Sequence, residues 1–287
     1  MKRDISHIFL IVLACLLVIT GTSVAEEPLR VAITSAVASD PSYKHYKELT
    51  EYVAQKAGKK SLFVSDLSYS QVDDLFIARQ VDVGFLCNTH FARRKDAVKF
   101  EAIAAPVIMG HTKPKFRLYI IVSKDSSFKS LNDLRGASVD LADPLSTTTI
   151  YTVLKLLEKN ETLTSFFKKA IYSGSHDMTV RLVADKVVDA GVIDGHIWDY
   201  HDKVQPAYSS KTKIIYKSPE YTTPPVVVSR TIDPSLKKKL RDILLTMHKD
   251  VRGREILKQL RIEKFVAVTD KDYEDVHEIY RKVKGRL

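Results

Sequence analysis

Short apolar runs alternate with segments of helical periodicity in the first part of the chain. Runs at residues 29–34, 62–64 and 81–86 predict buried strands, and residues 43–57 and about 70–80 predict the helices between them. Strands that alternate with helices form parallel sheets, because each helix returns the chain to the starting edge. The pattern therefore predicts an α/β fold.

The same pattern recurs in the second half of the chain. Residues 188–194 read VDAGVID and echo residues 81–87, which read VDVGFLC; a helix and a polar turn precede each run. We therefore expect one α/β unit to be used twice, once in each of two lobes. In open α/β sheets ligands collect beyond the carboxyl ends of the strands. The turns expected around one crevice are those at Tyr69, Cys87, Ser146, His176 and Asp194.

Two further apolar strands are predicted between the repeated units and the ends of the chain. They cover residues 116–123 and 226–229, and two extended segments that pass between lobes would form a hinge. We assign residues 26–118 to the first lobe and residues 119–222 to the second. Residues 223–287 are expected to return to the first lobe as one strand followed by helices.

The N-terminal residues have the pattern of an export signal. Lys2 and Arg3 precede an apolar run at residues 8–19, and small residues lead to Ala25. The run is shorter than the roughly 18 to 20 residues of a spanning helix, so we expect a signal peptide over residues 1–25. An uncleaved anchor and a lipoprotein modified at Cys15 are the alternatives.

Charge and cysteine content narrow the choice of ligands. The chain of 287 residues carries a formal charge of +10, which falls to about +9 without the leader. For an exported protein this favours anionic ligands over nucleic acid. Cys87 is then the single cysteine, so the mature chain has no intramolecular disulfide. We expect it to be a small buried side chain, with a reactive thiol as the alternative.

The stretch at residues 143–151 joins a predicted strand to a predicted helix and carries four consecutive hydroxyl residues. Ser146 is a good N-cap, and no acidic side chain follows it before Glu158. The positive end of the helix is therefore uncompensated and attracts anions. Three consecutive threonines also disfavour a helix by roughly 1 to 2 kcal/mol. An oxyanion site explains these features, and a plain helix cap is the alternative.

These residues resemble the periplasmic binding proteins of phosphate, phosphite and phosphonate ABC importers, in the right order over nearly the whole mature chain. In that family hydroxyls and helix N–H groups hold the phosphoryl oxygens, which corresponds here to Ser146, Thr147 and Thr148. His176 and Tyr69 match a ligand-contacting histidine and tyrosine. The resemblance implies a type II fold of two lobes, each with a mostly parallel sheet flanked by helices and joined by two hinge strands.

The same resemblance implies a function. It points to a monomeric periplasmic protein that captures a small phosphorus oxyanion without a cofactor and delivers it to a membrane permease. A second family tyrosine appears here as Phe116, and acidic residues that hold an ammonium group correspond to His196 and the region of Thr223. An aminophosphonate is therefore not the expected ligand. Cys87, Asn88 and Asp194 follow the repeated strands and complete the candidate site.

A sensor, a metal site and an enzyme are the other possibilities that these residues raise. Related arsenite-binding proteins that signal to a histidine kinase use a cysteine, so Cys87 keeps a sensor as the alternative. The spacing of Asp194, His196, Asp199 and His201 does not place both histidines on one helical face, so no metal site is expected. No nucleophile elbow or phosphate-binding Gly-rich loop is present, so we predict no catalytic residues.

Overall fold

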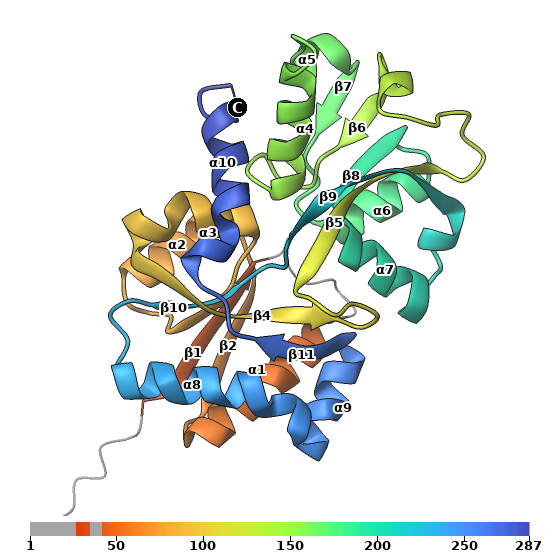
Figure 1. The fold of residues 1–287 in the computed structure, drawn as a ribbon. Coiled ribbons are helices and arrows are strands. Elements are labelled where there is room, and N and C mark those ends of the chain that lie inside the picture. Colours follow the sequence, from red (N-terminus) through yellow and green to blue (C-terminus); the bar gives the residue numbers. More distant parts are fainter. Residues whose placement is uncertain (1–26, 35–41, 287) are drawn as a thin grey trace, which may run out of the picture.

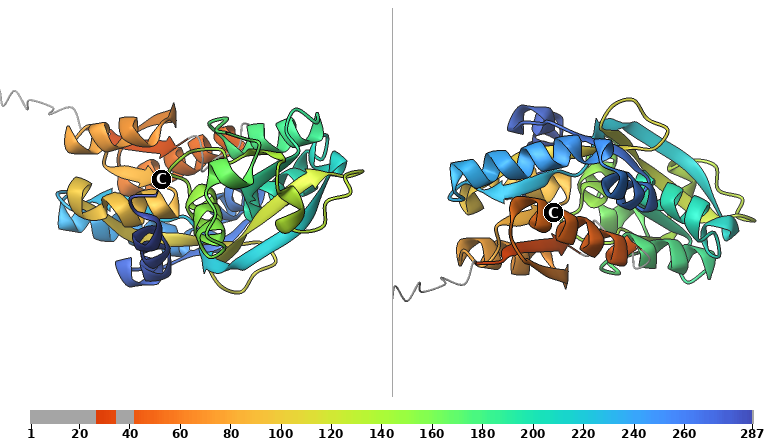
Figure 2. Two further views of the ribbon diagram at one scale, coloured as in Figure 1. Left: turned by 90° about the horizontal axis from the view of Figure 1, so that it is seen from above. Right: turned by 90° about the horizontal axis from the view of Figure 1, so that it is seen from below.

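The chain folds into two lobes, each built on one β-sheet with helices packed against it (Figure 1). The computed structural model describes residues 27–34 and 42–286, and the predicted signal peptide lies outside these residues. Views from above and below show the lobes side by side, with the second lobe in green and cyan (Figure 2). In the described part of the chain, every helix is too short or too polar to pass through a lipid bilayer.

The first lobe contains a sheet with the strand order β2-β1-β3-β10-β4-β11. Strands β10 and β11 run against the direction of the others. The strands are β1 (Leu29–Thr34), β2 (Ser61–Leu67), β3 (Val83–Phe85), β4 (Phe100–Ile108), β10 (Val226–Ser229) and β11 (Ile262–Val266). The helices are α1 (Tyr43–Ala57), α2 (Tyr69–Ile77), α3 (Asn88–Arg94), α8 (Pro234–Thr246) and α9 (Val251–Gln259).

The second lobe contains a sheet with the strand order β7-β6-β8-β5-β9. Only β5 runs against its neighbours in this described sheet. The strands are β5 (Lys115–Ser123), β6 (Ser138–Asp140), β7 (Lys169–Ile171), β8 (Ala190–Asp194) and β9 (Thr212–Thr222). The helices are α4 (Thr147–Leu157), α5 (Leu163–Phe166), α6 (His176–Ala184) and α7 (Gly195–Val204).

The two sheets share one topology, which confirms the prediction of a repeated unit. Strands β2, β1, β3 and β4 correspond to β7, β6, β8 and β9, and each sheet inserts one strand that arrives from the other lobe, β10 or β5. This exchange defines the type II arrangement, so the expected fold class is confirmed. The prediction omitted β4, β7, β9 and β11, which all take places in the sheets.

The chain crosses between the lobes earlier than the sequence indicated. Lys115, the first residue of β5, already pairs with Thr222 in the second sheet. The crossings are therefore the segments 109–114 and 223–225, between β4 and β5 and between β9 and β10. The expected boundary at residue 118 falls inside β5, and the two supposed hinge strands are full members of the sheets.

The aspartates of the repeated motif fix the edges of the sheets. Asp82 accepts a hydrogen bond from the backbone N–H of Arg30 in β1 at 2.9 Å. Asp189 accepts one from the backbone N–H of Ser138 in β6, the equivalent strand, at 2.8 Å. Both carboxylates thus satisfy a backbone donor of the unit's first strand.

The glycines of the motif let a helix approach the sheet closely. A Cβ at Gly84 in β3 would stand 2.9 Å from the ring of Phe76 in α2. A Cβ at Gly191 in β8 would overlap Thr179 and stand 3.0 Å from Val183, both in α6. A side chain at Gly84 would therefore displace α2, which begins at Tyr69, and a side chain at Gly191 would displace α6, which begins at His176.

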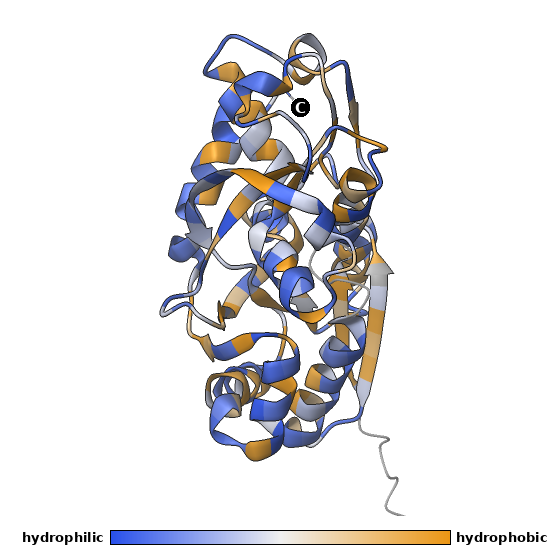
Figure 3. Ribbon diagram, turned by 90° about the vertical axis from the view of Figure 1, so that its right-hand side faces the viewer, coloured by the Kyte–Doolittle hydropathy of each residue, from blue (hydrophilic) through white to orange (hydrophobic). Residues whose placement is uncertain are grey.

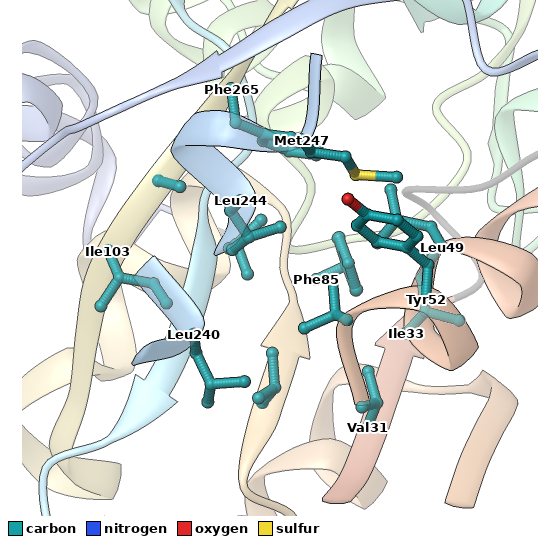
Figure 4. Packing of buried hydrophobic residues seen from close by; sticks show 14 of the residues in the cluster. Val31, Ile33, Leu49, Tyr52, Phe85, Ile103, Leu240, Leu244, Met247 and Phe265 are labelled. Atoms are coloured by element: carbon teal, nitrogen blue, oxygen red, sulfur yellow. The ribbon is translucent and has the colours of Figure 1, made fainter. Parts of the chain in front are cut away.

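The largest part of the core fills the space between the first sheet and helices α1 and α8. Figure 4 shows its side chains pointing toward one another from the sheet and from both helices. Figure 3 shows apolar residues along the strands and polar residues along the outer helices. The residues labelled in Figure 4 are Val31, Ile33, Leu49, Tyr52, Phe85, Ile103, Leu240, Leu244, Met247 and Phe265.

The C-terminal helix packs on both lobes, whereas the sequence predicts that it packs on the first lobe alone. Helix α10 (Glu274–Val283) contacts both α3 of the first lobe and α4 of the second (Figure 1). Val276, Ile279 and Val283 join one apolar cluster with Ala92 of α3 and Ile150 of α4. The helix therefore bridges the lobes next to the start of α4.

Candidate functional site

The hydroxyl-rich turn begins helix α4, as predicted, and its hydroxyls are buried. Ser146 is the N-cap and accepts a hydrogen bond from the N–H of Thr149 at 3.2 Å, which confirms its capping role. Its own proton faces the carbonyls of Asp143 at 2.9 Å and Leu141 at 3.2 Å. Thr149 donates to the carbonyl of Asp143 at 2.6 Å. These hydroxyls therefore stabilise the turn itself.

The remaining donors at this helix end have different surroundings. The N–H groups of Thr147 and Thr148 belong to the first helical turn, where no intrahelical acceptor exists. The first turn contains no acidic side chain, so its positive potential is uncompensated. The Thr148 hydroxyl lies 2.6 Å from the Ser146 Oγ and 3.3 Å from the Leu141 carbonyl. The role of all three residues toward a ligand stays a prediction.

The start of α4 touches the start of α3 across the gap between the lobes. Thr147 Oγ1 lies 3.2 Å from Cys87 Sγ and 3.4 Å from Thr89 Oγ1. Thr89 also donates to the carbonyl of Leu145 at 2.8 Å. The lobes are therefore closed on each other at these two helix starts. Cys87 is buried, as expected from its sequence.

Tyr69 is the first residue of α2 and is brought to the same place. Its ring stacks on the His90 ring with centroids 4.6 Å apart. Its hydroxyl is buried beside the Cys87 thiol but makes no hydrogen bond of normal geometry. Burial is the main cause that raises the Tyr69 pKa well above its usual value, followed by the neighbouring Cys87 thiol and Asp143. The hydroxyl is therefore a neutral donor.

His176 is the first residue of α6, at the position that Tyr69 holds in the first unit. The preceding turn is held by Asp140, which accepts from the N–H of Ser173 at 3.0 Å and from its hydroxyl at 2.6 Å. Both ring nitrogens of His176 are buried without a partner. Burial, and next the nearby His196, lower the pKa of His176 to about 3. The ring is neutral and offers one N–H.

Asp194 and His196 begin helix α7, and both are buried. Asp194 Oδ2 lies 3.7 Å from His176 Nε2, and its Oδ1 has no partner. Burial raises the pKa of Asp194 to about 8. Burial also lowers the pKa of His196 to about 4. The His196 ring packs against the Phe116 ring in a T-shaped arrangement, with ring centroids 5.4 Å apart.

Two further residues adjoin this site. The Asn88 side-chain amide donates to the Thr222 carbonyl, close to the crossing segment, while its Oδ1 has no partner. The sequence analysis did not include His90 and Thr89. His90 Nε2 is hydrogen-bonded to Asp73 Oδ1 of α2 at 2.7 Å. A signal was available, because both missed residues directly follow Cys87 and Asn88, which the sequence analysis did include.

The structure thus brings the predicted site residues to one place, and a cavity lies beside that place. Within the described residues, no three His, Cys, Asp or Glu side chains are grouped as a metal site requires. A cavity of about 350 Å³ opens next to His196 and is lined also by Tyr46, Trp198 and Asp199. The helix starts themselves are packed closely, with Ser146 and Thr148 fully buried.

The exchange of one strand between two sheets, with polar helix starts between closed lobes, defines a periplasmic binding protein of type II. The model of the family described as ABC transporter, phosphonate, periplasmic substrate-binding protein matches residues 31–273. The chain belongs to this family. It is a family of transport proteins, and the comparisons give no support to the sensor alternative.

Relatives with known names agree with this assignment. A probable ABC transporter phosphite-binding protein, PhnD1, of Prochlorococcus marinus is 29% identical over 121 residues, and the match covers 40% of this chain and 41% of that protein. The phosphonates-binding periplasmic protein of Escherichia coli is 24% identical over 252 residues, 85% of this chain and 73% of that protein.

Solved structures show the same fold. The binding component of an ABC phosphonate transporter from Pseudomonas aeruginosa gives a TM-score of 0.82 at 22% identity, covering 90% of this chain and 87% of that one. PhnD1 of Prochlorococcus marinus in complex with methylphosphonate gives 0.79 at 20% identity, covering 89% and 98%. At these identities the likeness concerns the fold alone.

Proposed function

We propose that this protein captures a small phosphorus oxyanion, namely phosphate, phosphite or a simple phosphonate, for an ABC importer. In this proposal it acts as a monomer in the periplasm, needs no cofactor and docks its closed form on a membrane permease. The names of the relatives support the ligand class, and membership of a transport family supports the permease and speaks against an enzyme.

One observation carries the proposal. Several buried side chains at helix starts, including Asn88 and His196, have polar atoms without hydrogen-bond partners, although such atoms are normally paired. The proposal uses three of these side chains, one from the first lobe and two from the second. They are the Tyr69 hydroxyl, the His176 ring nitrogens and Asp194 Oδ1. An oxyanion among them would accept from Tyr69, His176 and the amides of α4.

The binding mode relies on neutral donors. Burial keeps both the Tyr69 hydroxyl and the His176 ring neutral, because it raises the pKa of Tyr69 and lowers that of His176. Hydrogen bonds from neutral donors to an ion are about twice as strong as those between neutral groups. The site can therefore bind an anion while the lobes close around it.

The experiment is a calorimetric titration of the mature protein with phosphate, phosphite, methylphosphonate and sulfate. We expect at least one phosphorus oxyanion to bind and sulfate to bind more weakly. Tyr69→Phe removes only one hydroxyl and should weaken binding roughly 10- to 100-fold, the loss of a hydrogen bond to a charged group.

Tyr151→Phe is the matched control, because the Tyr151 hydroxyl bonds to Tyr216 at 2.6 Å inside the second lobe. It should leave the affinity unchanged. Wild-type protein that binds none of the phosphorus oxyanions would contradict the proposed function, and equal effects of both variants would contradict the proposed site.

A further inference from the structure

Asp194 is an acid at a place that attracts anions. It stands at the end of β8 as the N-cap of α7, but its side chain makes no capping hydrogen bond. The residue is 2% exposed, and its Oδ1 has no partner. Its Oδ2 lies 3.7 Å from His176 Nε2, which is too far for a hydrogen bond. The carboxyl group therefore has unused hydrogen-bonding capacity inside the cleft.

The groups around Asp194 supply no positive charge. His176 of α6 and His196 of α7 are neutral, because burial lowers the pKa of each. Tyr69 of α2 lies close enough for the Asp194 charge to raise its pKa further. On β5, the guanidinium of Arg117 is bound to the Ser218 carbonyl at 2.7 Å and to a glutamate. No described cation therefore compensates a negative Asp194.

A negative Asp194 beside a bound oxyanion would be strongly unfavourable. Like charges in a buried site raise the pKa of a carboxyl group, as burial does. Burial alone already raises the pKa of Asp194 to about 8, and an anion in the cleft would raise it further. A protonated carboxyl group, in contrast, offers one O–H donor to the ligand.

We propose that Asp194 binds the oxyanion as a hydrogen-bond donor, so that the carboxyl group and the ligand share one proton inside the closed cleft. This inference rests on the proposed function and adds that the ligand enters together with a proton. It makes Asp194 a determinant of specificity, since the site accepts an oxyanion whose charge is reduced by that proton.

The test measures protons taken up on binding, by titrating the mature protein with methylphosphonate in two buffers of different ionisation enthalpy. At about pH 8.5 the wild type should take up roughly 0.5 to 1 proton per ligand bound, because binding raises the Asp194 pKa. Its affinity should fall about tenfold between pH 8 and pH 9.5 by the same linkage.

Asp194→Asn keeps the shape and supplies a permanent N–H donor. It should bind methylphosphonate within about threefold of the wild type at neutral pH, without this proton uptake and with an almost flat alkaline profile. Asp199→Asn is the matched control on the same helix, because Asp199 accepts from the Tyr119 hydroxyl at 3.1 Å. It should behave like the wild type.

Several results would overturn the inference. Equal proton uptake by the wild type and Asp194→Asn would do so, as would a folded Asp194→Asn protein that has lost binding, since the site would then need an ionised carboxylate. If Asp194→Asn does not fold, the wild type decides alone, and uptake near zero contradicts the proposal. Wild-type protein that binds none of the phosphorus oxyanions contradicts the proposed function and this inference together.

Discussion

The two repeated units share their scaffold residues and differ in the residues that face the cleft. Asp82 and Asp189 both bind a backbone N–H of the first strand of their unit, and Gly84 and Gly191 both admit a helix. At the helix starts, however, Tyr69 and Cys87 of the first unit are replaced by His176 and Asp194 in the second.

This difference teaches where the fold is constrained and where it is free. Backbone pairing and close helix packing demand the same residue types wherever the unit is used. The side chains at these four helix starts carry no such demand, because neither backbone pairing nor close helix packing fixes their chemistry. The first lobe contributes a phenol hydroxyl and a thiol, and the second contributes an imidazole and a carboxyl group.

The largest expected difference between the two units is in how the free energy of unfolding depends on acidic pH. His176 and His196 in the second unit have pKa values of about 3 and about 4, below the value of about 6.5 in an unfolded chain. The unfolded state therefore binds protons first at these two histidines. Asp194 acts in the opposite direction, because its folded pKa of about 8 lies above the unfolded value of about 3.9, and it offsets roughly one histidine over this range. The free energy of unfolding should therefore fall by about 2 to 3 kcal/mol from about pH 6.5 to about pH 4.

Urea unfolding at a series of pH values checks this prediction. His176→Gln should flatten the acid limb, because the glutamine does not titrate. Tyr69→Phe, at the equivalent position of the first unit, should leave the limb as steep as in the wild type. A His176→Gln profile as steep as the wild-type profile would contradict the assignment of a neutral buried ring.

The two glycines should respond unequally to an added methyl group. Gly191→Ala meets two branched side chains, and Thr179 cannot rotate freely because it also binds Asp140. We expect a loss of about 3 kcal/mol from overpacking. Gly84→Ala meets the flat ring of Phe76 at 2.9 Å and Val227 Cγ2 at 3.2 Å, which are less severe overlaps, and should lose about 1 to 2 kcal/mol.

Equilibrium unfolding measures both losses. Combining Gly84→Ala with Phe76→Leu should recover part of the stability that Gly84→Ala alone removes, since the methyl group then has room. A loss at Gly84 as large as that at Gly191 would show that the two helices are packed equally tightly.

The aspartates should give the smallest effects. Asp82→Ala removes a partly buried acceptor of the Arg30 backbone N–H and of its guanidinium, and should lower the free energy of unfolding by about 1 to 2 kcal/mol. Asp189→Ala removes an exposed acceptor and should lower it by about 0.5 to 1 kcal/mol. Neither should alter ligand affinity, and a changed affinity would contradict a purely structural role.

Much of the fold could be predicted because its signals are local. The apolar run at residues 29–34 and the cap at Ser146 mark their elements without reference to distant residues. Strand β4 contains Pro106 and several alanines, and the five residues of β11 include Glu263 and Lys264; all of these are weak strand formers. These strands form because neighbouring strands supply backbone hydrogen-bond partners, β10 and β11 for β4 and β4 for β11, which a local pattern does not reveal.

The site shows the same limit. The sequence predicted that the candidate residues lie at turns beyond the strand ends, but it could not show which hydroxyls bond to the backbone. Ser146 and Thr149 donate to carbonyls of the preceding turn, whereas Thr147 faces the other lobe. It also could not show that α10 bridges the lobes, because that contact depends on the closed arrangement.

A crystal structure of the mature protein with bound methylphosphonate tests the central claim most directly. The account predicts phosphonate oxygens within hydrogen-bonding distance of the Thr147 and Thr148 amides, the Tyr69 hydroxyl and the His176 ring. Phosphonate bound instead in the neighbouring cavity beside Trp198, with those four donors not touching it, would contradict the account.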